Sequence, residues 1–247
     1  MTSQDRTGLE VDRLTHRYGS KTALDGVSFS VEQGTFCALL GPNGAGKSTL
    51  FALLTRLFVP REGTIRVAGV SLHENPRAAL AMIGVVFQQP TLDLDLSVVQ
   101  NMKYFASLHG LSGSEADQRI GESLSRLGMA ERANEKVRSL NGGHRRRMEI
   151  ARSLVHRPRI LLLDEPTVGL DAASRQSITE HVHGLARDDG LTVLWATHLV
   201  DEVGDSDQLV VLHQGKIRAD ATSGEIRNGQ PLAQAFARLT HDGEAAA

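Results

Sequence analysis

Cysteine, aromatic residues and long apolar runs are scarce in this sequence. The 247 residues include one cysteine, Cys37, and aromatic residues make up 4% of the chain. A single cysteine excludes an internal disulfide, and its place in the apolar run Thr35–Leu40 predicts a buried side chain in a reducing environment. No stretch approaches the roughly 20 apolar residues that a membrane-spanning helix needs. We therefore do not expect this polypeptide to form a pore itself.

An excess of charge of either sign is lacking too. The formal net charge is -2, which gives no long-range field that would attract nucleic acid or an acidic membrane surface. The residues up to Leu14 contain no apolar segment of the kind found in secretory signals. We expect no nucleic-acid partner, and we expect any contact with a membrane to be made through another protein.

The apolar pattern indicates one α/β domain with an inserted helical lobe. Short apolar segments predict strands at 9–14, 23–31, 36–40, 83–87, 160–163, 192–196, 208–213 and 216–219. Helical spacing predicts helices from Lys47 to a point before Pro60 and over 98–108, 115–127, 145–155 and 173–186. The strands at 160–163 and 192–196, with a helix between them, are typical of a parallel βαβ unit. Residues 242–247 are expected to be a disordered tail.

A glycine-rich loop lies between a predicted strand and a predicted helix. It matches the phosphate-binding pattern G-x-x-x-x-G-K-[ST], in which backbone N–H groups approach phosphate oxygens. Lys47 would reach the β- and γ-phosphates of ATP, and Ser48 would bind Mg²⁺. A turn without a ligand would leave both side chains unexplained. The residues expected to bind the triphosphate are Gly41, Pro42, Asn43, Gly44, Ala45, Gly46, Lys47, Ser48 and Thr49.

Two carboxylates follow the apolar strand at 160–163. Asp164 would hold Mg²⁺ through water, and Glu165 would act as the general base on the attacking water. The alternative is a solvated strand end or a helix N-cap. The neighbouring phosphate loop favours the catalytic interpretation.

A third motif lies between the glycine-rich loop and the two carboxylates. It reads Leu140-Asn141-Gly142-Gly143-His144 and is followed by a predicted helix. Here the sequence resembles the ABC ATPase family, whose signature is usually L-S-G-G-Q, and the resemblance extends from about Leu9 to about Ala219. It implies a P-loop NTPase cassette of the α/β class, with a mixed sheet core, an antiparallel β subdomain and an inserted α-helical subdomain. The implied boundaries are 1–88 and 158–220 for the ATP-binding core, 89–157 for the helical subdomain, and 221–247 for a C-terminal helix and tail.

The resemblance also assigns roles to individual residues. Tyr18 occupies the place of the aromatic side chain that stacks on adenine, although it also reads as an ordinary turn tyrosine. Gln88 matches the glutamine that contacts Mg²⁺ and the attacking water, with Gln89 as the alternative register. Asp171 ends the D-loop that contacts the partner subunit, or else caps the next helix. His198 matches the histidine that hydrogen-bonds the γ-phosphate.

The signature departs from the common form. Asn141 replaces serine and His144 replaces glutamine, whereas Gly142 and Gly143 still permit close approach to a γ-phosphate. We expect ATP hydrolysis to survive at a reduced rate. The run Arg145–Arg147 is expected to face water or neighbouring carboxylates.

The family geometry places Asn141, Gly142, Gly143 and Asp171 of one subunit over the ATP of the other. A homodimer, or a heterodimer with another cassette, would thus drive a transmembrane permease from the cytoplasmic face. Its coupling helix would enter a groove near 88–96. The compact cassette resembles those of ABC-2-type exporters, and the signature and residues 86–96 resemble cassettes associated with pyrroloquinoline-quinone-dependent alcohol oxidation.

Two alternatives belong to other functional classes. One is a soluble ABC ATPase acting on a non-membrane partner; such proteins commonly carry two cassettes or coiled-coil insertions, which this sequence lacks. The other is an ATP-gated scaffold that does not hydrolyse ATP, against which Glu165 and His198 argue.

Overall fold

The polypeptide folds around two β-sheets, which the computed structural model describes over residues 7–241. One sheet is antiparallel with the order β2-β1-β4-β5, and the other is mixed with the order β10-β9-β3-β8-β7-β6. The strands are β1 Thr7–Tyr18, β2 Lys21–Glu32, β3 Phe36–Leu40, β4 Glu62–Val67, β5 Val70–Ser71, β6 Ile83–Val86, β7 Ile160–Asp164, β8 Thr192–Thr197, β9 Gln208–His213 and β10 Lys216–Thr222. The predicted combination of a mixed sheet and an antiparallel subdomain is confirmed.

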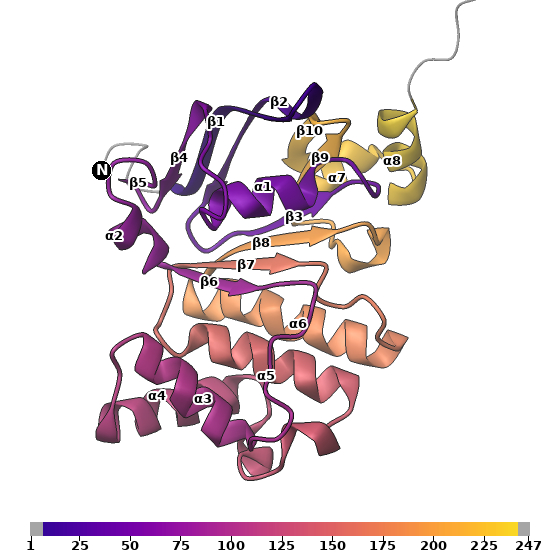
Figure 1. The fold of residues 1–247 in the computed structure, drawn as a ribbon. Helices are drawn as coiled ribbons and strands as arrows, with labels where there is room; N and C mark the ends of the chain where they lie inside the picture. Colours follow the sequence, from indigo (N-terminus) through magenta and orange to yellow (C-terminus); the bar gives the residue numbers. More distant parts are fainter. Residues whose placement is uncertain (1–6, 242–247) are drawn as a thin grey trace, which may run out of the picture.

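Helices lie on both faces of the mixed sheet (Figure 1). α1 lies between this sheet and the antiparallel one, α5 and α6 cover the opposite face, and α3 and α4 lie beyond them. The helices are α1 Lys47–Leu54, α2 Pro76–Leu80, α3 Val98–Leu108, α4 Gly113–Arg126, α5 Gly142–Leu154, α6 Ala172–Asp189, α7 Ser223–Arg227 and α8 Leu232–Thr240, with short 3-10 helices η2 Ala130–Arg132, η3 Val137–Ser139 and η4 Val200–Glu202. Since α3, α4 and α5 lie between β6 and β7 in the chain, they form the predicted inserted helical subdomain.

Strand β3 is buried on both faces and separates two apolar cores. Phe36, Ala38 and Leu40 pack into the core beneath α5 and α6. Cys37 and Leu39 point the other way, into the core shared by α1 and the antiparallel sheet. Successive side chains of a strand alternate between its faces, so a strand covered on both sides needs a continuous apolar run. The predicted burial of Cys37 is confirmed, since its side chain is inaccessible to solvent.

Parallel pairing brings the carboxyl ends of five strands, β9, β3, β8, β7 and β6, to one edge of the mixed sheet. β3 pairs with β8, β8 with β7, and β7 with β6, all in parallel, which confirms the predicted βαβ unit. Gly41 follows β3, Asp164 ends β7, and His198 follows β8 directly. Ligand sites of open α/β sheets lie outside this edge.

The helix after the glycine-rich loop is shorter than predicted. It was expected to continue towards Pro60, but α1 ends at Leu54. Arg56 has a φ of 58°, a left-handed conformation that cannot continue a right-handed helix. Leu57, predicted on the apolar helix face, consequently lies outside α1 and is 67% exposed.

Several short elements lie outside the predicted ones. In β4, Ile65 and Val67 are buried while Thr64 and Arg66 are exposed, a period-two pattern that the sequence already contained. α2 is a single short helix before β6, and α7 and α8 follow β10. The tail predicted to be disordered, 242–247, lies outside the described residues.

Candidate functional site

A cavity of about 870 Å³ opens at the carboxyl edge of the mixed sheet. Its wall combines the β3–α1 loop, the β1–β2 hairpin and residues that follow β6, β7, β8 and β9. The lining residues are Tyr18, Lys21, Thr22, Ala23, Pro42, Asn43, Gly44, Gly46, Lys47, Ser48, Thr49, Gln88, Glu165, Val168, His198, Gln214 and Gly215. The fold therefore gathers predicted site residues from distant parts of the chain into one cavity.

The loop between β3 and α1 leaves no room for side chains at two of its glycines. A Cβ atom on Gly41 would lie 2.4 Å from the carbonyl oxygen of Leu212, and one on Gly46 would lie 2.8 Å from that of Ala23. Gly46 also has a φ of 116°, immediately before α1 begins. Backbone N–H groups at such a loop and helix start favour phosphate oxygens. The loop is therefore built to approach an anion closely.

Lys47 is buried in the first turn of α1. Its Nζ donates to the carbonyl oxygens of Gly41 at 2.6 Å and Pro42 at 3.3 Å, and it lies 3.3 Å from Glu165 Oε1. A buried ammonium group needs such oxygen partners, because losing water is costly for a charge. This contact places the lysine charge beside the proposed general base.

Gln88 and His198 converge on the same Glu165 carboxylate. Gln88 Nε2 donates to Glu165 Oε2 at 3.3 Å, and His198 Nδ1 lies 3.4 Å from Oε1 without hydrogen-bond geometry. This His198 nitrogen is buried and has no hydrogen-bond partner among residues 7–241. Glu165 itself has a φ of 47°, a costly conformation for a residue with a side chain. Backbone strain of this kind concentrates at functional sites.

Asp164 is buried directly before Glu165, at the end of β7. Burial raises the pKa of Asp164, and the Glu165 charge raises it further, whereas Lys47 and Arg146 lower it. A nearby cation would favour the charged carboxylate. In the described part of the chain, no group of three or more His, Cys, Asp or Glu side chains could hold a metal ion.

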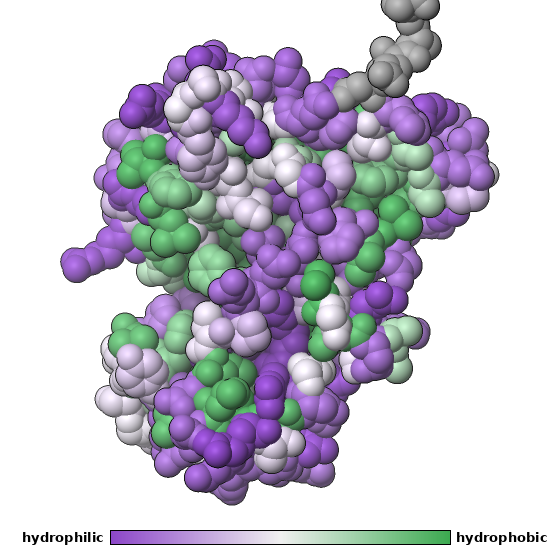
Figure 2. Space-filling model, turned by 45° about the vertical axis from the view of Figure 1, so that its right-hand side comes forward, coloured by the Kyte–Doolittle hydropathy of each residue, from purple (hydrophilic) through white to green (hydrophobic). Residues whose placement is uncertain are grey.

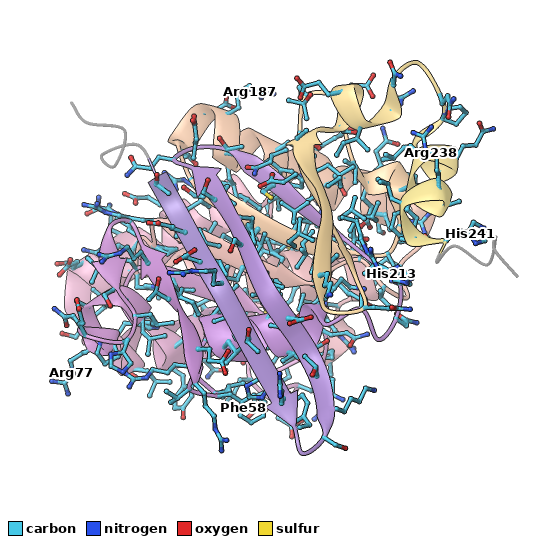
Figure 3. All side chains as sticks on the ribbon, turned by 90° about the horizontal axis from the view of Figure 1, so that it is seen from above. Phe58, Arg77, Arg187, His213, Arg238 and His241 are labelled. Carbon is cyan, nitrogen blue, oxygen red and sulfur yellow. The ribbon has the colours of Figure 1, made fainter. Side chains whose placement is uncertain are left out.

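Tyr18 lies at the end of β1, in an aromatic cluster at the cavity entrance. Its ring meets His16 edge-on at 4.8 Å and Phe58 edge-on at 5.9 Å between ring centroids. Figure 3 shows Phe58 near the tip of the β1–β2 hairpin. The Tyr18 hydroxyl lies 3.5 Å from Thr49 Oγ1, and the side chain remains 47% exposed. A half-exposed aromatic ring can stack on a planar ligand.

The signature residues do not line the cavity. Asn141 instead begins α5, where its side-chain oxygen accepts a hydrogen bond from His144 N at 2.8 Å. Asp171 begins α6 in the same way, accepting from Ser174 N at 2.9 Å. A Cβ on Gly143 would lie 2.8 Å from Ser174 Oγ, so these two helix starts are adjacent. Within one chain, both polar residues act as helix N-caps.

Replacing Asn141 by serine is expected to keep the cap of α5 and to maintain or increase ATP turnover. Both side chains accept the N-terminal hydrogen bond, and serine restores the common signature. Asn141→Ala should instead lower the free energy of unfolding by about 1 kcal/mol, because the cap is lost. Urea unfolding and phosphate-release measurements on both variants check this. Complete loss of turnover in Asn141→Ser would show that the variant signature has another task.

The arginine run after the signature was expected to face water or neighbouring carboxylates, which holds for Arg146 but not for the printed contacts of Arg145 and Arg147. Arg146 is buried and pairs with the buried Glu149 at 2.8 Å. Arg145 donates to the backbone of the η3 segment, and Arg147 donates to Ser177 Oγ at 2.7 Å. Packing of α5 against the sheet and α6 turns these side chains inwards, which a local charge run does not reveal.

The sequence analysis also missed several cavity residues. Lys21, Thr22 and Ala23 come from the β1–β2 hairpin, and Gln214 and Gly215 come from the β9–β10 turn. Ala23 was predicted to begin the strand 23–31, and none of the five residues was given a role in the site. Only the tertiary fold places these residues opposite the phosphate loop, so their part in the cavity could not be predicted from composition or spacing.

Comparisons with known proteins agree with this geometry. Residues 24–168 match the family model described as ABC transporter. The chain is 36% identical to the linearmycin resistance ATP-binding protein LnrL of Bacillus subtilis, over 88% of this chain and 70% of that protein. It is 35% identical to the probable multidrug ABC transporter ATP-binding protein YbhF of Escherichia coli, over 96% of this chain but 42% of that protein.

A solved structure agrees as well. The dimeric post-hydrolysis structure of the ATP-binding cassette MJ0796, bound to ADP and phosphate, is similar with a TM-score of 0.74 and 28% identity, covering 87% of this chain and 98% of that one. The matched family model covers more than half of the chain. The chain therefore belongs to the ABC transporter family, as an ATP-binding and ATP-hydrolysing cassette.

Proposed function

We propose that the cavity at the carboxyl edge binds ATP with Mg²⁺ and hydrolyses it. The convergence of Lys47, Gln88 and His198 on the Glu165 carboxylate carries this proposal. Glu165 would take a proton from the attacking water as it meets the γ-phosphate, and Gln88 would orient that water. His198 and Lys47 would hold the γ-phosphate, and the Tyr18 ring would stack on adenine.

The residues present fit a magnesium ion. Asp164 is buried with a raised pKa and would be stabilised in its charged form by a cation. Ser48 lines the cavity directly after Lys47, and Gln88 lines it from the end of β6. Oxygen ligands of this kind suit Mg²⁺, which usually keeps several waters and binds substrate phosphates.

We further propose that two cassettes enclose ATP between them. In this chain Asn141, Gly142, Gly143 and Asp171 lie outside the cavity that holds Lys47, as the predicted exchange between subunits requires. The dimeric cassette similar to this chain supports the proposal. The partner would be a second copy of this chain or another cassette. ATP would favour the closed pair, and hydrolysis would release it.

The third proposal is that a transmembrane permease docks on the helical subdomain. A groove of about 560 Å³ lies between β6, the following loop and α3, where residues 88–96 were predicted to receive a coupling helix. Phe87, Tyr104 and Leu108 line this groove and are exposed. Figure 2 shows that hydrophobic residues reach the surface of the lower, helical half of the molecule as a patch with hydrophilic surroundings. Exposed apolar patches of this kind mark interaction sites.

The permease would supply the passage through the membrane. Over residues 7–241, no helix is both long enough and apolar enough to cross a bilayer. We propose a cytoplasmic cassette held at the inner face of the membrane through its permease, with the boundaries 1–88 and 158–220, 89–157 and 221–247 stated above. Relatives named for drug resistance and multidrug transport support export as the direction.

Within the exporters, we keep a narrower proposal: membership of the group associated with pyrroloquinoline-quinone-dependent alcohol oxidation. It rests on the signature Asn141–His144 and on residues 86–96. Deleting the chain's gene in its host and measuring growth on alcohols against growth on other carbon sources tests it. Equal growth on both would refute the narrower proposal alone.

The decisive experiment is purification of the full chain from its native membranes in mild detergent, followed by measurement of phosphate release. We expect a polytopic membrane protein to co-purify and ATP hydrolysis to depend on Mg²⁺. Hydrolysis without any membrane partner would instead favour a soluble ABC ATPase. ATP binding without phosphate release, with the partner present, would indicate a scaffold that does not hydrolyse.

A further inference from the structure

Arg146 lies where the helical subdomain meets two loops of the ATP site. It belongs to the second turn of α5, the helix that begins at the signature, and is 7% exposed. Its five acceptors are the carbonyl oxygens of Phe87 (2.7 Å, from Nη1), Gln88 (3.3 Å, from Nη2), Glu165 (3.4 Å, from Nη2) and Pro166 (from Nε), and Glu149 Oε2 (2.8 Å, from Nη1). One side chain thus holds the segment after β6 and the segment after β7 together.

This contact set matches the chemistry of arginine. A guanidinium has five N–H donors in a rigid plane, and each of the five contacts uses one of them. Glu149, itself buried, balances the charge and also accepts a hydrogen bond from Thr91 N at 2.8 Å. Lysine has three donors at a single point and cannot reproduce this planar set.

The neighbouring contacts show that one face of α5 holds the loop after β6. Arg146, Glu149 and Arg152 are spaced three residues apart and therefore share a helix face. Arg152 Nη1 donates to the Thr91 carbonyl oxygen at 2.9 Å, so the first part of the loop is held at a second point. A movement of α5 would be passed directly to Gln88.

The second loop carries backbone strain that Arg146 helps to offset. Glu165 has a φ of 47°, and such conformations persist only where surrounding contacts hold them. Arg146 donates hydrogen bonds to two consecutive carbonyl oxygens, those of Glu165 and Pro166. The guanidinium therefore holds the backbone on the carboxyl side of the strained residue.

We propose that Arg146 is a positioning residue for ATP hydrolysis, which holds Gln88 and Glu165 in register with each other and couples both to the signature helix. This inference rests on the proposed roles of those two residues. Arg146 does not line the ATP cavity, so it acts on turnover rather than on ATP binding.

The test is Arg146→Lys in the full chain, with its neighbours in the same run as matched controls. We expect Arg146→Lys to lower kcat about 10- to 100-fold, because small misplacements of catalytic groups have effects of this size. The Kd for ATP and the KM should change less than about twofold, because the loop between β3 and α1 is unchanged. Arg145→Lys and Arg147→Lys should stay within about twofold of wild type in kcat, because their partners lie in η3 and α6.

Glu149→Gln serves as a second variant in case Arg146→Lys fails to fold. It keeps the side-chain volume and one oxygen acceptor while removing the charge, so kcat should fall about threefold to tenfold with unchanged ATP affinity. Circular dichroism melting verifies folding for every variant. Wild-type kcat in folded Arg146→Lys or Glu149→Gln, or an equal loss in Arg147→Lys, would overturn the proposal.

Glu165→Gln, measured in parallel, distinguishes a failure of the proposed Glu165 role from a failure of the proposed Arg146 role. If Glu165→Gln hydrolyses ATP normally, the proposed role of Glu165 fails. If Glu165→Gln is inactive while folded Arg146→Lys matches wild type, only the positioning role of Arg146 fails.

Discussion

Replacing Glu165 by glutamine is expected to stop ATP turnover while leaving ATP binding intact. Glutamine keeps the shape of the side chain and an oxygen that can accept from Gln88, but it cannot take a proton from water. General-base catalysis typically contributes about 100- to 10,000-fold, so kcat should fall by that range. Lys47 would lose its 3.3 Å ion pair but keep two carbonyl partners, so the loop between β3 and α1 should keep its conformation.

The measurement combines steady-state phosphate release with equilibrium ATP binding and size-exclusion chromatography. Because bound ATP would no longer be removed, the closed dimer should accumulate when ATP is present. Asp201→Asn is a suitable control: it removes an exposed carboxylate just after His198, whose ion pair is with Arg175. Normal hydrolysis in Glu165→Gln would contradict the general-base role, and a parallel loss in Asp201→Asn would point to a nonspecific charge effect.

Local motifs were enough to predict the phosphate loop and the acidic strand end. The loop requires glycines at fixed positions, and Gly41 and Gly46 prove to be in contact distance of other backbone segments. The apolar strand before Asp164 pairs in parallel on both sides, as its continuous apolar run predicted. Both features are formed by residues that are close together in the sequence, so the sequence alone was enough to predict them.

Features that depend on packing between distant segments were not predictable in this way. The arginine run was expected to face water or neighbouring carboxylates; Arg146 does meet the Glu149 carboxylate, but its burial and its carbonyl acceptors in the loops after β6 and β7 were not predicted. The early end of α1 depends on the left-handed Arg56, a residue type that gives no sign of that conformation. Asp171 could be read as a D-loop residue or as a helix cap, and within one chain it caps α6.

The ATP-binding role of the signature remains a prediction for the same physical reason. Asn141 and Asp171 point their side-chain oxygens at their own helix starts, and neither lines the cavity. Their proposed contact with ATP comes from a second subunit, so it depends on an interface that one chain does not contain. The adjacency of the two helix starts would let both reach the same nucleotide across that interface.

Replacing Lys47 by alanine is expected to weaken ATP binding strongly. Hydrogen bonds to charged groups contribute about 1.5–3 kcal/mol each, so losing the ammonium contacts to the β- and γ-phosphates should raise the Kd for ATP about 10- to 100-fold or more. The change also leaves the Glu165 carboxylate, 11% exposed, without its 3.3 Å cation partner, which adds like-charge repulsion toward the triphosphate. Calorimetric titration with ATP and Mg²⁺ measures this loss.

Lys21→Ala is the matched control, because Lys21 lines the same cavity from an exposed position on the β1–β2 hairpin and should change the Kd less than about threefold. Unchanged ATP affinity in Lys47→Ala, or equal losses in both variants, would mean that the cradle between β3 and α1 does not hold the triphosphate through this lysine.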